Sequence, residues 1–216
     1  MIFNLADHQT IGNRFVSELR DVHIQKDRMR FRRNLERIGE VLAYEISKTL
    51  TYKQKEVETP LGVALVNLPT DRIVLGTILR AGLPMHQGML NVFDDADNAF
   101  ISAYRMHHKD GTFEIKMEYV SCPDLTDSIL ILTDPMLATG ASISIALEGL
   151  QGFGTPKALH FATAIASENG INHIQRHFPK ARLWMGAIDA ELTAKSYIVP
   201  GLGDAGDLCF GTKLQD

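Results

Sequence analysis

One run of the chain places an acid and a loop of small residues directly after an apolar stretch. Residues 129–133 (ILILT) are of the type that forms a buried strand, and Asp134 comes next. Residues 139–142 (TGAS) then begin a predicted helix, where free backbone N–H groups favour a phosphate and small side chains let it approach closely. A carboxylate beside that phosphate could accept hydrogen bonds from two ribose hydroxyls. We interpret the run as a ribose-5-phosphate site, with a simple capped turn as the alternative.

A Walker A loop is excluded, because the run contains no Gly-Lys pair. A second candidate for binding phosphate is Arg80, which lies at the end of the apolar run that starts at residue 73 and is followed by Gly82. A guanidinium group at the end of a strand can bind a pyrophosphate in fork geometry. An ordinary surface ion pair is the alternative for Arg80 taken alone.

The C-terminal part of the chain is rich in glycine. Residues 201–206 (GLGDAG) match the pattern G-x-G-x-x-G, but we exclude a dinucleotide-binding unit because no further strand and helix can follow before Asp216. Dense glycine leaves backbone N–H and C=O groups accessible. We therefore expect this segment to bind a ligand through its backbone.

These motifs resemble those of one enzyme family. Residues 134–142 (DPMLATGAS) are similar to the loop that binds phosphoribosyl pyrophosphate (PRPP) in type I phosphoribosyltransferases, in the form typical of the uracil phosphoribosyltransferase branch. Residues 197–207 (YIVPGLGDAGD) resemble the uracil-binding segment of that branch. Backbone amides in such a segment can match the alternating acceptor and donor groups of uracil.

The resemblance covers residues 70–213 well and the N-terminal third loosely. Pro135 stands where the usual type I loop has a second acid. Further departures from the family pattern are Pro84, Ala141 and the pair Leu208-Cys209. Alanine at position 141 fits if that residue is already helical, and would be strained if the loop needed a positive φ there.

The resemblance implies a role for each residue of these motifs. The implied catalytic residues are Arg80, Arg105, Asp134 and Asp204. The implied PRPP-binding residues are Arg80, Arg105, Asp134, Pro135, Met136, Leu137, Ala138, Thr139, Gly140, Ala141, Ser142 and Asp204. The implied uracil-binding residues are Ile198, Gly203, Asp204 and Ala205. No side chain is assigned as a metal ligand, because Mg2+ is expected mainly through PRPP and water.

The implied reaction transfers the 5-phosphoribosyl group from PRPP to N1 of uracil, giving UMP and pyrophosphate in pyrimidine salvage. The resemblance also implies a homodimer or larger homo-oligomer, and GTP is a candidate effector. Three alternatives stay open: transfer to another nucleobase, a PRPP- or nucleotide-sensing RNA-binding regulator on the same fold, and a catalytically inactive homologue. The basic segment 20–37 supports the regulator, and the formal net charge of −4 opposes it.

The elements that must position these residues can be predicted from periodicity. Strand and helix patterns alternate over residues 70–190, which indicates an α/β fold with a mostly parallel, doubly wound sheet. The resemblance specifies this as the type I phosphoribosyltransferase fold with a C-terminal base-binding hood. The predicted strands are 73–78, 99–104, 129–133, 158–166 and 182–188, and the predicted helices are 27–50, 84–93, 141–152 and 168–178. A turn at 59–62 suggests a hairpin, and residues 102–121 are predicted to form a projecting hairpin arm.

Length and composition are consistent with one domain over residues 1–216. Within it we expect an N-terminal helical region and hairpin start (1–60), a core (70–190) and a uracil-binding segment (191–216). Hydrophobic residues are 45% of the chain, and no uncharged apolar stretch is long enough to span a membrane. Two distant cysteines and the absence of a signal-peptide pattern lead us to expect a cytoplasmic protein without membrane or nucleic-acid partners.

Overall fold

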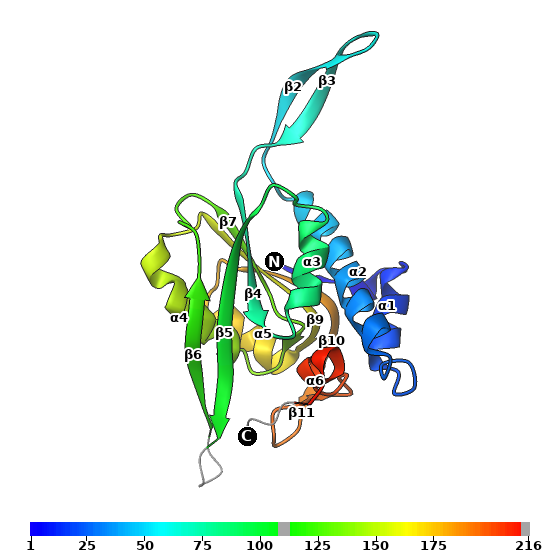
Figure 1. The fold of residues 1–216 in the computed structure, drawn as a ribbon, viewed down its shortest axis with the longest axis vertical. Helices are drawn as coiled ribbons and strands as arrows, with labels where there is room; N and C mark the ends of the chain where they lie inside the picture. The colour runs from blue at the N-terminus through cyan, green and yellow to red at the C-terminus, as the bar shows by residue number, and fades with distance from the viewer. Residues whose placement is uncertain (108–112, 213–216) are drawn as a thin grey trace.

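The computed structural model describes the backbone of residues 1–107 and 113–212, and the side chains of residues 1–102 and 119–212. Its centre is an eight-stranded sheet flanked by helices (Figure 1). The strands in spatial order are β1 (Ile2–Asn4), β10 (Arg182–Asp189), β9 (Ala158–Ser167), β7 (Ile129–Thr133), β4 (Ile73–Leu79), β5 (Asp97–His107) and β6 (Phe113–Ser121), and β8 (Met136–Leu137) also pairs with β9. Every pairing is parallel except that of β5 with β6. The predicted α/β fold with a mostly parallel sheet is confirmed.

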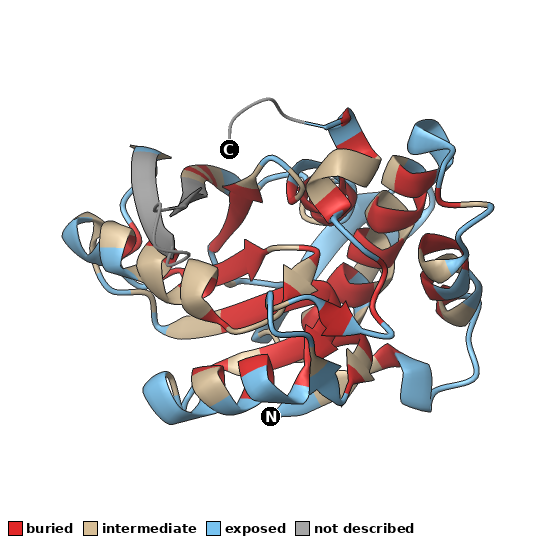
Figure 2. Cartoon of the chain, turned by 90° about the horizontal axis from the view of Figure 1, so that it is seen from below, coloured by how far each residue is buried: buried red, intermediate tan, exposed pale blue. Residues whose placement is uncertain are grey.

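Helices cover both faces of the sheet, because residues alternate between the two faces along each strand. Leu75 and Ile131 pack into the cluster formed with α1 (Gly12–Arg20), α2 (Arg28–Ser47) and α3 (Leu83–Leu90). Their neighbours Val74 and Leu130 pack on the opposite face with α4 (Ala141–Leu150) and α5 (Glu168–His177). Figure 2 shows the result as buried strands between helices that are buried on the side toward the sheet. The architecture is therefore three layers, α/β/α.

Helix α2 matches the predicted helix 27–50 closely. Asp27 caps its first turn, since its Oδ1 accepts a hydrogen bond from the backbone N–H of Arg30 at 3.1 Å. The apolar stripe is fully buried, and consists of Phe31, Leu35, Ile38, Leu42 and Ile46. The helix ends at Ser47, so the C-terminal boundary is three residues earlier than predicted.

Two hairpins lie at opposite ends of the molecule. Strands β2 (Tyr52–Thr59) and β3 (Gly62–Pro69) form a separate two-stranded hairpin, which confirms the predicted turn at 59–62. Figure 1 shows this hairpin projecting at the end of the sheet where β4 begins. The predicted arm at 102–121 is formed by β5 and β6 within the central sheet, and its turn, 108–112, lies outside the described residues.

Several elements differ from the prediction. The N-terminal strand β1 joins the sheet beside β10, and α1 precedes the predicted helix. The loop after Asp134 contains the short strand β8. The glycine-rich C-terminal part forms β12 (Ile198–Val199), paired with β11 (Glu191–Leu192), and a short helix, α6 (Ala205–Phe210). Among the helices that the structure describes, none is long and apolar enough to cross a membrane.

Candidate active site

The candidate site lies where two neighbouring strands end. β4 and β7 pair in parallel, from Ile73 beside Ile129 to Thr77 beside Thr133. The sheet continues from β4 to β5 on one side and from β7 to β9 on the other, so the strand order reverses between β4 and β7. Ligands of open α/β sheets bind at the carboxyl ends of strands at such a point. Arg80 follows β4 and Asp134 follows β7, so the topology delivers both to this edge.

The phosphate loop, residues 134–142, is tied to the next strand. The Asp134 N–H donates to the carbonyl of Ala162 at 3.2 Å, and strand β8 pairs with β9 at Ile165 and Ala166. Further along, the Ser167 hydroxyl donates to the carbonyl of Ala138. These contacts fix the loop backbone against β9 before α4 begins.

Gly140 is where the loop turns into helix α4. Its φ of 83° lies in the left-handed region that favours glycine. Ala141 is the first residue of α4, so the alanine that departs from the family pattern occupies a helical position and is not strained. A Cβ added at position 140 would lie 2.7 Å from Cδ2 of His173, so the ring leaves no room for a side chain there.

His173 on α5 is a neighbour of the phosphate loop that the sequence did not reveal. Its Nε2 lies 2.9 Å from the hydroxyl of Ser144, one turn into α4. Burial, with smaller effects from His177 and Arg176, lowers the pKa of His173. No spacing pattern links positions 144 and 173, and only the packing of α5 against α4 brings them together.

Arg80 belongs to a tight turn after β4. The Leu79–Arg80 peptide is cis, and a Cβ at Gly82 would lie 2.2 Å from Oγ1 of Thr77. Pro84 lies in the first turn of α3, where a helix needs no N–H donor, so this second departure from the family pattern fits the helix. The Arg80 side chain is half exposed, and its Nη2 lies 3.9 Å from Oδ1 of Asp207 on α6. The turn after β4 and the C-terminal segment are therefore neighbours, as Figure 1 also shows.

The predicted base-binding residues lie on the loop that leads into α6. Ile198 and Ala205 are buried, whereas Gly203 and Asp204 are exposed. Asp204 caps α6, because its Oδ1 accepts from the N–H of Asp207 at 3.0 Å. In the part of the chain that the structure describes, no hydrogen bond engages the backbone of Gly203. That backbone is available to a ligand, as the glycine-rich pattern led us to expect.

The third departure from the family pattern, Leu208-Cys209, lies on α6. Cys209 is fully buried, and its carbonyl accepts a hydrogen bond from Nη1 of Arg32 at 2.6 Å. Burial raises the pKa of the Cys209 thiol to about 12, so the side chain is a neutral core residue. The pair therefore contributes packing to α6 on its underside.

Arg105 can be placed only by its backbone. It lies on β5 opposite Ile115 of β6, and its side chain is outside the described part of the chain. Its predicted contact with pyrophosphate stays a prediction.

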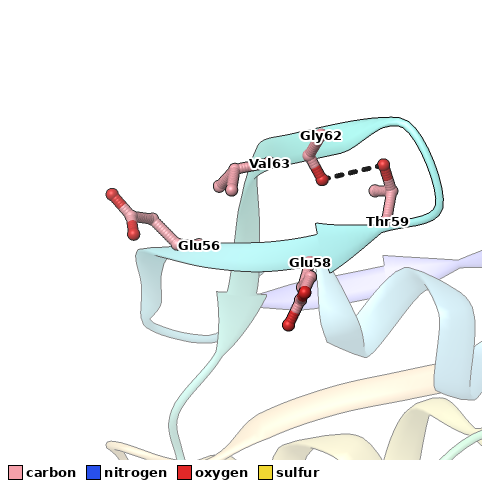
Figure 3. Close-up of a pocket in the computed structure, with 5 residues that line it drawn as sticks. All are labelled: Glu56, Glu58, Thr59, Gly62 and Val63. Atoms are coloured by element: carbon pink, nitrogen blue, oxygen red, sulfur yellow. Dashed lines mark hydrogen bonds between the residues drawn. The ribbon is translucent and has the colours of Figure 1, made fainter.

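Two hollows lie away from this edge. One, of about 470 Å³, opens at the β2–β3 hairpin and is lined by Glu56, Glu58, Thr59, Gly62 and Val63 (Figure 3). Its two carboxylates would repel a phosphorylated substrate, so we place no substrate there. The other, of about 340 Å³, is lined by Ile11, Arg14, Phe15, Glu18, Arg30 and Arg37. Within the described residues, no three His, Cys, Asp or Glu side chains gather as a metal site.

Comparison with known proteins points to one family. The family model described as uracil phosphoribosyltransferase matches residues 6–212. A uracil phosphoribosyltransferase of Porphyromonas gingivalis is 52% identical over 214 residues, with 99% of each chain covered. One from Thermococcus gammatolerans is 39% identical over 203 residues, covering 93% of this chain and 89% of the relative. The solved structure of the AQ2163 protein from Aquifex aeolicus matches with a TM-score of 0.87 at 31% identity, covering 99% of this chain and 100% of that one.

Proposed function

The chain belongs to the uracil phosphoribosyltransferase family, and from that premise we propose that it transfers the 5-phosphoribosyl group of PRPP to N1 of uracil. The products are UMP and pyrophosphate, and the reaction serves pyrimidine salvage. The observation that carries the proposal is the meeting of three segments at one sheet edge. Arg80 follows β4, the phosphate loop follows the neighbouring β7, and Asp207 of the C-terminal helix lies 3.9 Å from Arg80.

The proposed roles follow from the chemistry of the bond that breaks. Cleavage between ribose C1 and the pyrophosphate oxygen gives the sugar oxocarbenium character and leaves negative charge on pyrophosphate. Asp134 would orient the ribose, and the N–H groups at the start of α4 would bind the 5-phosphate. Arg80, with Arg105, would stabilise the leaving pyrophosphate.

The base would be recognised mainly by backbone. Gly203 and Ala205 would present N–H and C=O groups to uracil, next to Ile198, and Asp204 would lie on the PRPP side. Because Asp204 also caps α6, its carboxylate would position this loop as well as face the substrates. The whole chain, residues 1–216, would act as one domain, with 191–216 covering the base.

Magnesium fits this edge through the substrate. Asp134 and Asp204 offer carboxylate oxygens, the ligand type that Mg2+ prefers, and the ion usually keeps several waters. We propose that PRPP oxygens and water bind most of the ion. When bound, Mg2+ would offset the charge of the pyrophosphate group.

A base panel tests the proposal. The purified protein would be incubated with PRPP, Mg2+ and, separately, uracil, hypoxanthine, guanine, xanthine or orotate, and nucleotide formation followed. We expect UMP from uracil and no nucleotide from the others. Nucleotide from another base would keep the PRPP site and refute the base assignment. No product from any base, together with PRPP binding in a titration, would favour a binding regulator.

Self-association is proposed from the β2–β3 hairpin. Its strands project from the body and expose several apolar side chains, namely Val57, Leu61, Val63, Leu65, Val66 and Leu68. A projecting apolar surface of this kind is typical of a contact with another chain. We propose a homodimer or larger homo-oligomer that covers it.

A cavity beside α1 and α2 is a candidate effector site. The cavity beside α1 and α2 presents the three guanidinium groups of Arg14, Arg30 and Arg37 with the one carboxylate of Glu18, which favours an anion such as GTP. Saturable binding of GTP that is weakened by Arg37→Gln would support this assignment. The thiols of Cys122 and Cys209 are free, which is consistent with a reducing cytoplasm.

A further inference from the structure

A partly buried ion pair holds the loop that leads to the proposed base site. Arg20, the last residue of α1, donates from Nη1 and Nη2 to the two carboxylate oxygens of Asp189, each at 2.8 Å. Asp189 is the last residue of β10, and its side chain is 6% exposed. The pair joins residues 169 positions apart in the sequence.

Both members of the pair also bind the backbone of Gly201. The Gly201 N–H donates to Oδ2 of Asp189 at 2.9 Å, and the Gly201 carbonyl accepts from Nη1 of Arg20 at 3.0 Å. The backbone N–H and C=O of Gly201 are thus both held by charged side chains, and these two side chains also bind each other. Hydrogen bonds to charged groups are about twice as strong as neutral ones.

Gly201 occupies a position that no other residue fits easily. Its φ is 57°, and a Cβ there would lie 2.1 Å from the carbonyl of Ile198. Gly203 follows two residues later, and the intervening Leu202 is buried. Because only the buried Leu202 separates Gly201 from Gly203, a displacement of Gly201 also moves the backbone groups proposed to bind uracil.

The other end of the segment is anchored separately. Arg32 of α2 donates to the carbonyl of Cys209 at 2.6 Å, and a Cβ at Gly211 would lie 3.3 Å from Nη2 of Arg28. Between the two anchors lie Gly203 and Asp204, which are exposed. The segment is fixed at its ends and open at its centre, as a preformed binding loop requires.

We propose that Arg20 and Asp189 are positioning residues for uracil, fixing Gly201 so that the backbone of residues 203–205 presents its hydrogen-bonding groups in register with the base. The inference rests on the proposed function. The pair should affect the two substrates differently, because the phosphate loop is held by β9 and α5 and not by Arg20 and Asp189. Loss of the pair should therefore weaken the use of uracil more than the binding of PRPP, which meets this segment only at Asp204.

The test uses two variants and a matched control. Asp189→Asn keeps the size of the side chain and removes the charge that binds both Arg20 and Gly201. Arg20→Lys keeps the positive charge but cannot bind both carboxylate oxygens at once. It replaces Asp189→Asn as the test variant if Asp189→Asn folds poorly. Asp97→Asn is the control, because it removes the exposed ion pair of Asp97 with Arg72, whose Nη2 lies 2.7 Å away. For each protein we would measure the KM for uracil, kcat, the Kd for PRPP alone and the Tm.

We expect Asp189→Asn to raise the KM for uracil roughly 10- to 100-fold, the range for loss of charge-assisted hydrogen bonds. The Kd for PRPP should rise by a clearly smaller factor than the KM for uracil, and Asp97→Asn should change neither value by more than about twofold. The double variant Arg20→Lys/Asp189→Asn should raise the KM for uracil by clearly less than the product of the two single effects, since the residues act as a unit.

Two results would overturn the inference. The first is an unchanged KM for uracil in both single variants. The second is an equal loss of uracil use and PRPP binding that follows the fall in Tm, which would indicate a general structural role. If the unmodified protein makes no UMP from uracil, the proposed function itself fails, and this inference fails with it.

Discussion

Asp134 and Arg80 lie at the same edge of the sheet because the strands that carry them are neighbours and run in the same direction. Each follows the last residue of its strand by one position, and the register places Thr77 beside Thr133, three residues before Arg80 and one before Asp134. The Thr133 hydroxyl donates to the carbonyl of Gly76 at 3.0 Å, which joins the two strand ends. The chemistry of the site therefore depends on a strand register as much as on the two side chains.

Replacing Asp134 by Asn tests the proposed ribose contact. The amide has the shape of the carboxylate but lacks the charge, so hydrogen bonds from ribose hydroxyls would be weaker. We expect the Kd for PRPP, measured by calorimetry, to rise about 10- to 100-fold. Unaltered binding of PRPP would contradict the role, provided that Asp97→Asn, at a distant exposed site, behaves like the unmodified protein.

The need for glycine at position 140 can be tested by comparing Gly140→Ala with Gly152→Ala, because Gly152 has no close neighbours. Gly140→Ala forces a side chain into a left-handed conformation, at a cost of about 1–2 kcal/mol, and against the ring of His173. A Cβ at Gly152 would meet nothing within 4 Å, so Gly152→Ala should change stability by less than about 0.5 kcal/mol. We expect only Gly140→Ala to lower both the Tm and the affinity for PRPP. Equal effects of the two variants would refute this account of the loop.

At the scale of elements, the basic surface of α1 and α2 has a structural use. Five of its arginines contact acids or a carbonyl group of the chain itself, in the pairs Arg14–Glu18, Arg20–Asp189, Arg30–Glu18, Arg32–Cys209 and Arg33–Glu36. Charges that are paired in this way attract a polyanion less than isolated ones do. The basic segment that supported an RNA-binding regulator thus has an explanation within the fold.

The junction of α1 and α2 should make stability depend on pH. Hydrogen bonds from Asn34 and Arg14, with Arg30, lower the pKa of the Glu18 carboxyl from 4.5 to about 2. A depressed pKa stabilises the folded state fully above about pH 4.5, and this contribution disappears as the pH falls toward 2. Glu18→Gln should therefore be less stable than the unmodified protein at pH 7, and the difference should shrink below pH 4. Urea unfolding at pH 7, 4 and 3 measures it, and a difference independent of pH would contradict the assignment.

Long periodic elements could be predicted from sequence, and short ones could not. Helix α2 has a cap and five turns of apolar spacing, and β7 is a continuous apolar run, so both were predicted nearly at their true bounds. Strands β1, β8, β11 and β12 have two or three residues each, too few for any period to show. Helix α6 has six residues in a glycine-rich stretch, and its N-cap, Asp204, is the only sign of the helix in the sequence.

The candidate site rests partly on sequence motifs and partly on contacts that only the packing shows. The phosphate loop and residues 203–205 are contiguous in sequence, so their types and spacing were visible. Arg20, Asp189 and His173 act across long sequence separations, and no local pattern reports which distant residue each will contact. Their contribution becomes apparent only when the helices are packed on the sheet.

At the scale of the whole molecule, the two ends of the sheet have different surfaces. The carboxyl edge carries the candidate site, and the opposite end carries the projecting β2–β3 hairpin (Figure 1). An assembly that covers the hairpin would leave the carboxyl edge open to substrates. Self-association and catalysis should therefore be separable by substitution.

A charged hairpin tests that separation. Val63 and Leu65 lie two residues apart on one face of β3 and are 65% and 62% exposed. We expect Val63→Lys/Leu65→Lys to reduce the assembly to single chains of 24.0 kDa in sedimentation experiments. Val22→Lys, at a side chain 61% exposed between α1 and α2, is the control and should assemble normally. A monomeric unmodified protein, or dissociation by the control as well, would refute the proposed contact.

Cys209 lies on the buried side of α6, so chemical labelling of its thiol can report when that helix moves. Its thiol has no exposed surface and a pKa raised to about 12, so a thiol-modifying reagent at neutral pH can react only while α6 is lifted. The rate of labelling would then report how often α6 moves away from the core. In a Cys122→Ser background, we expect PRPP and uracil together to slow that rate if they bind against this segment, and labelling without substrates would give the reference rate.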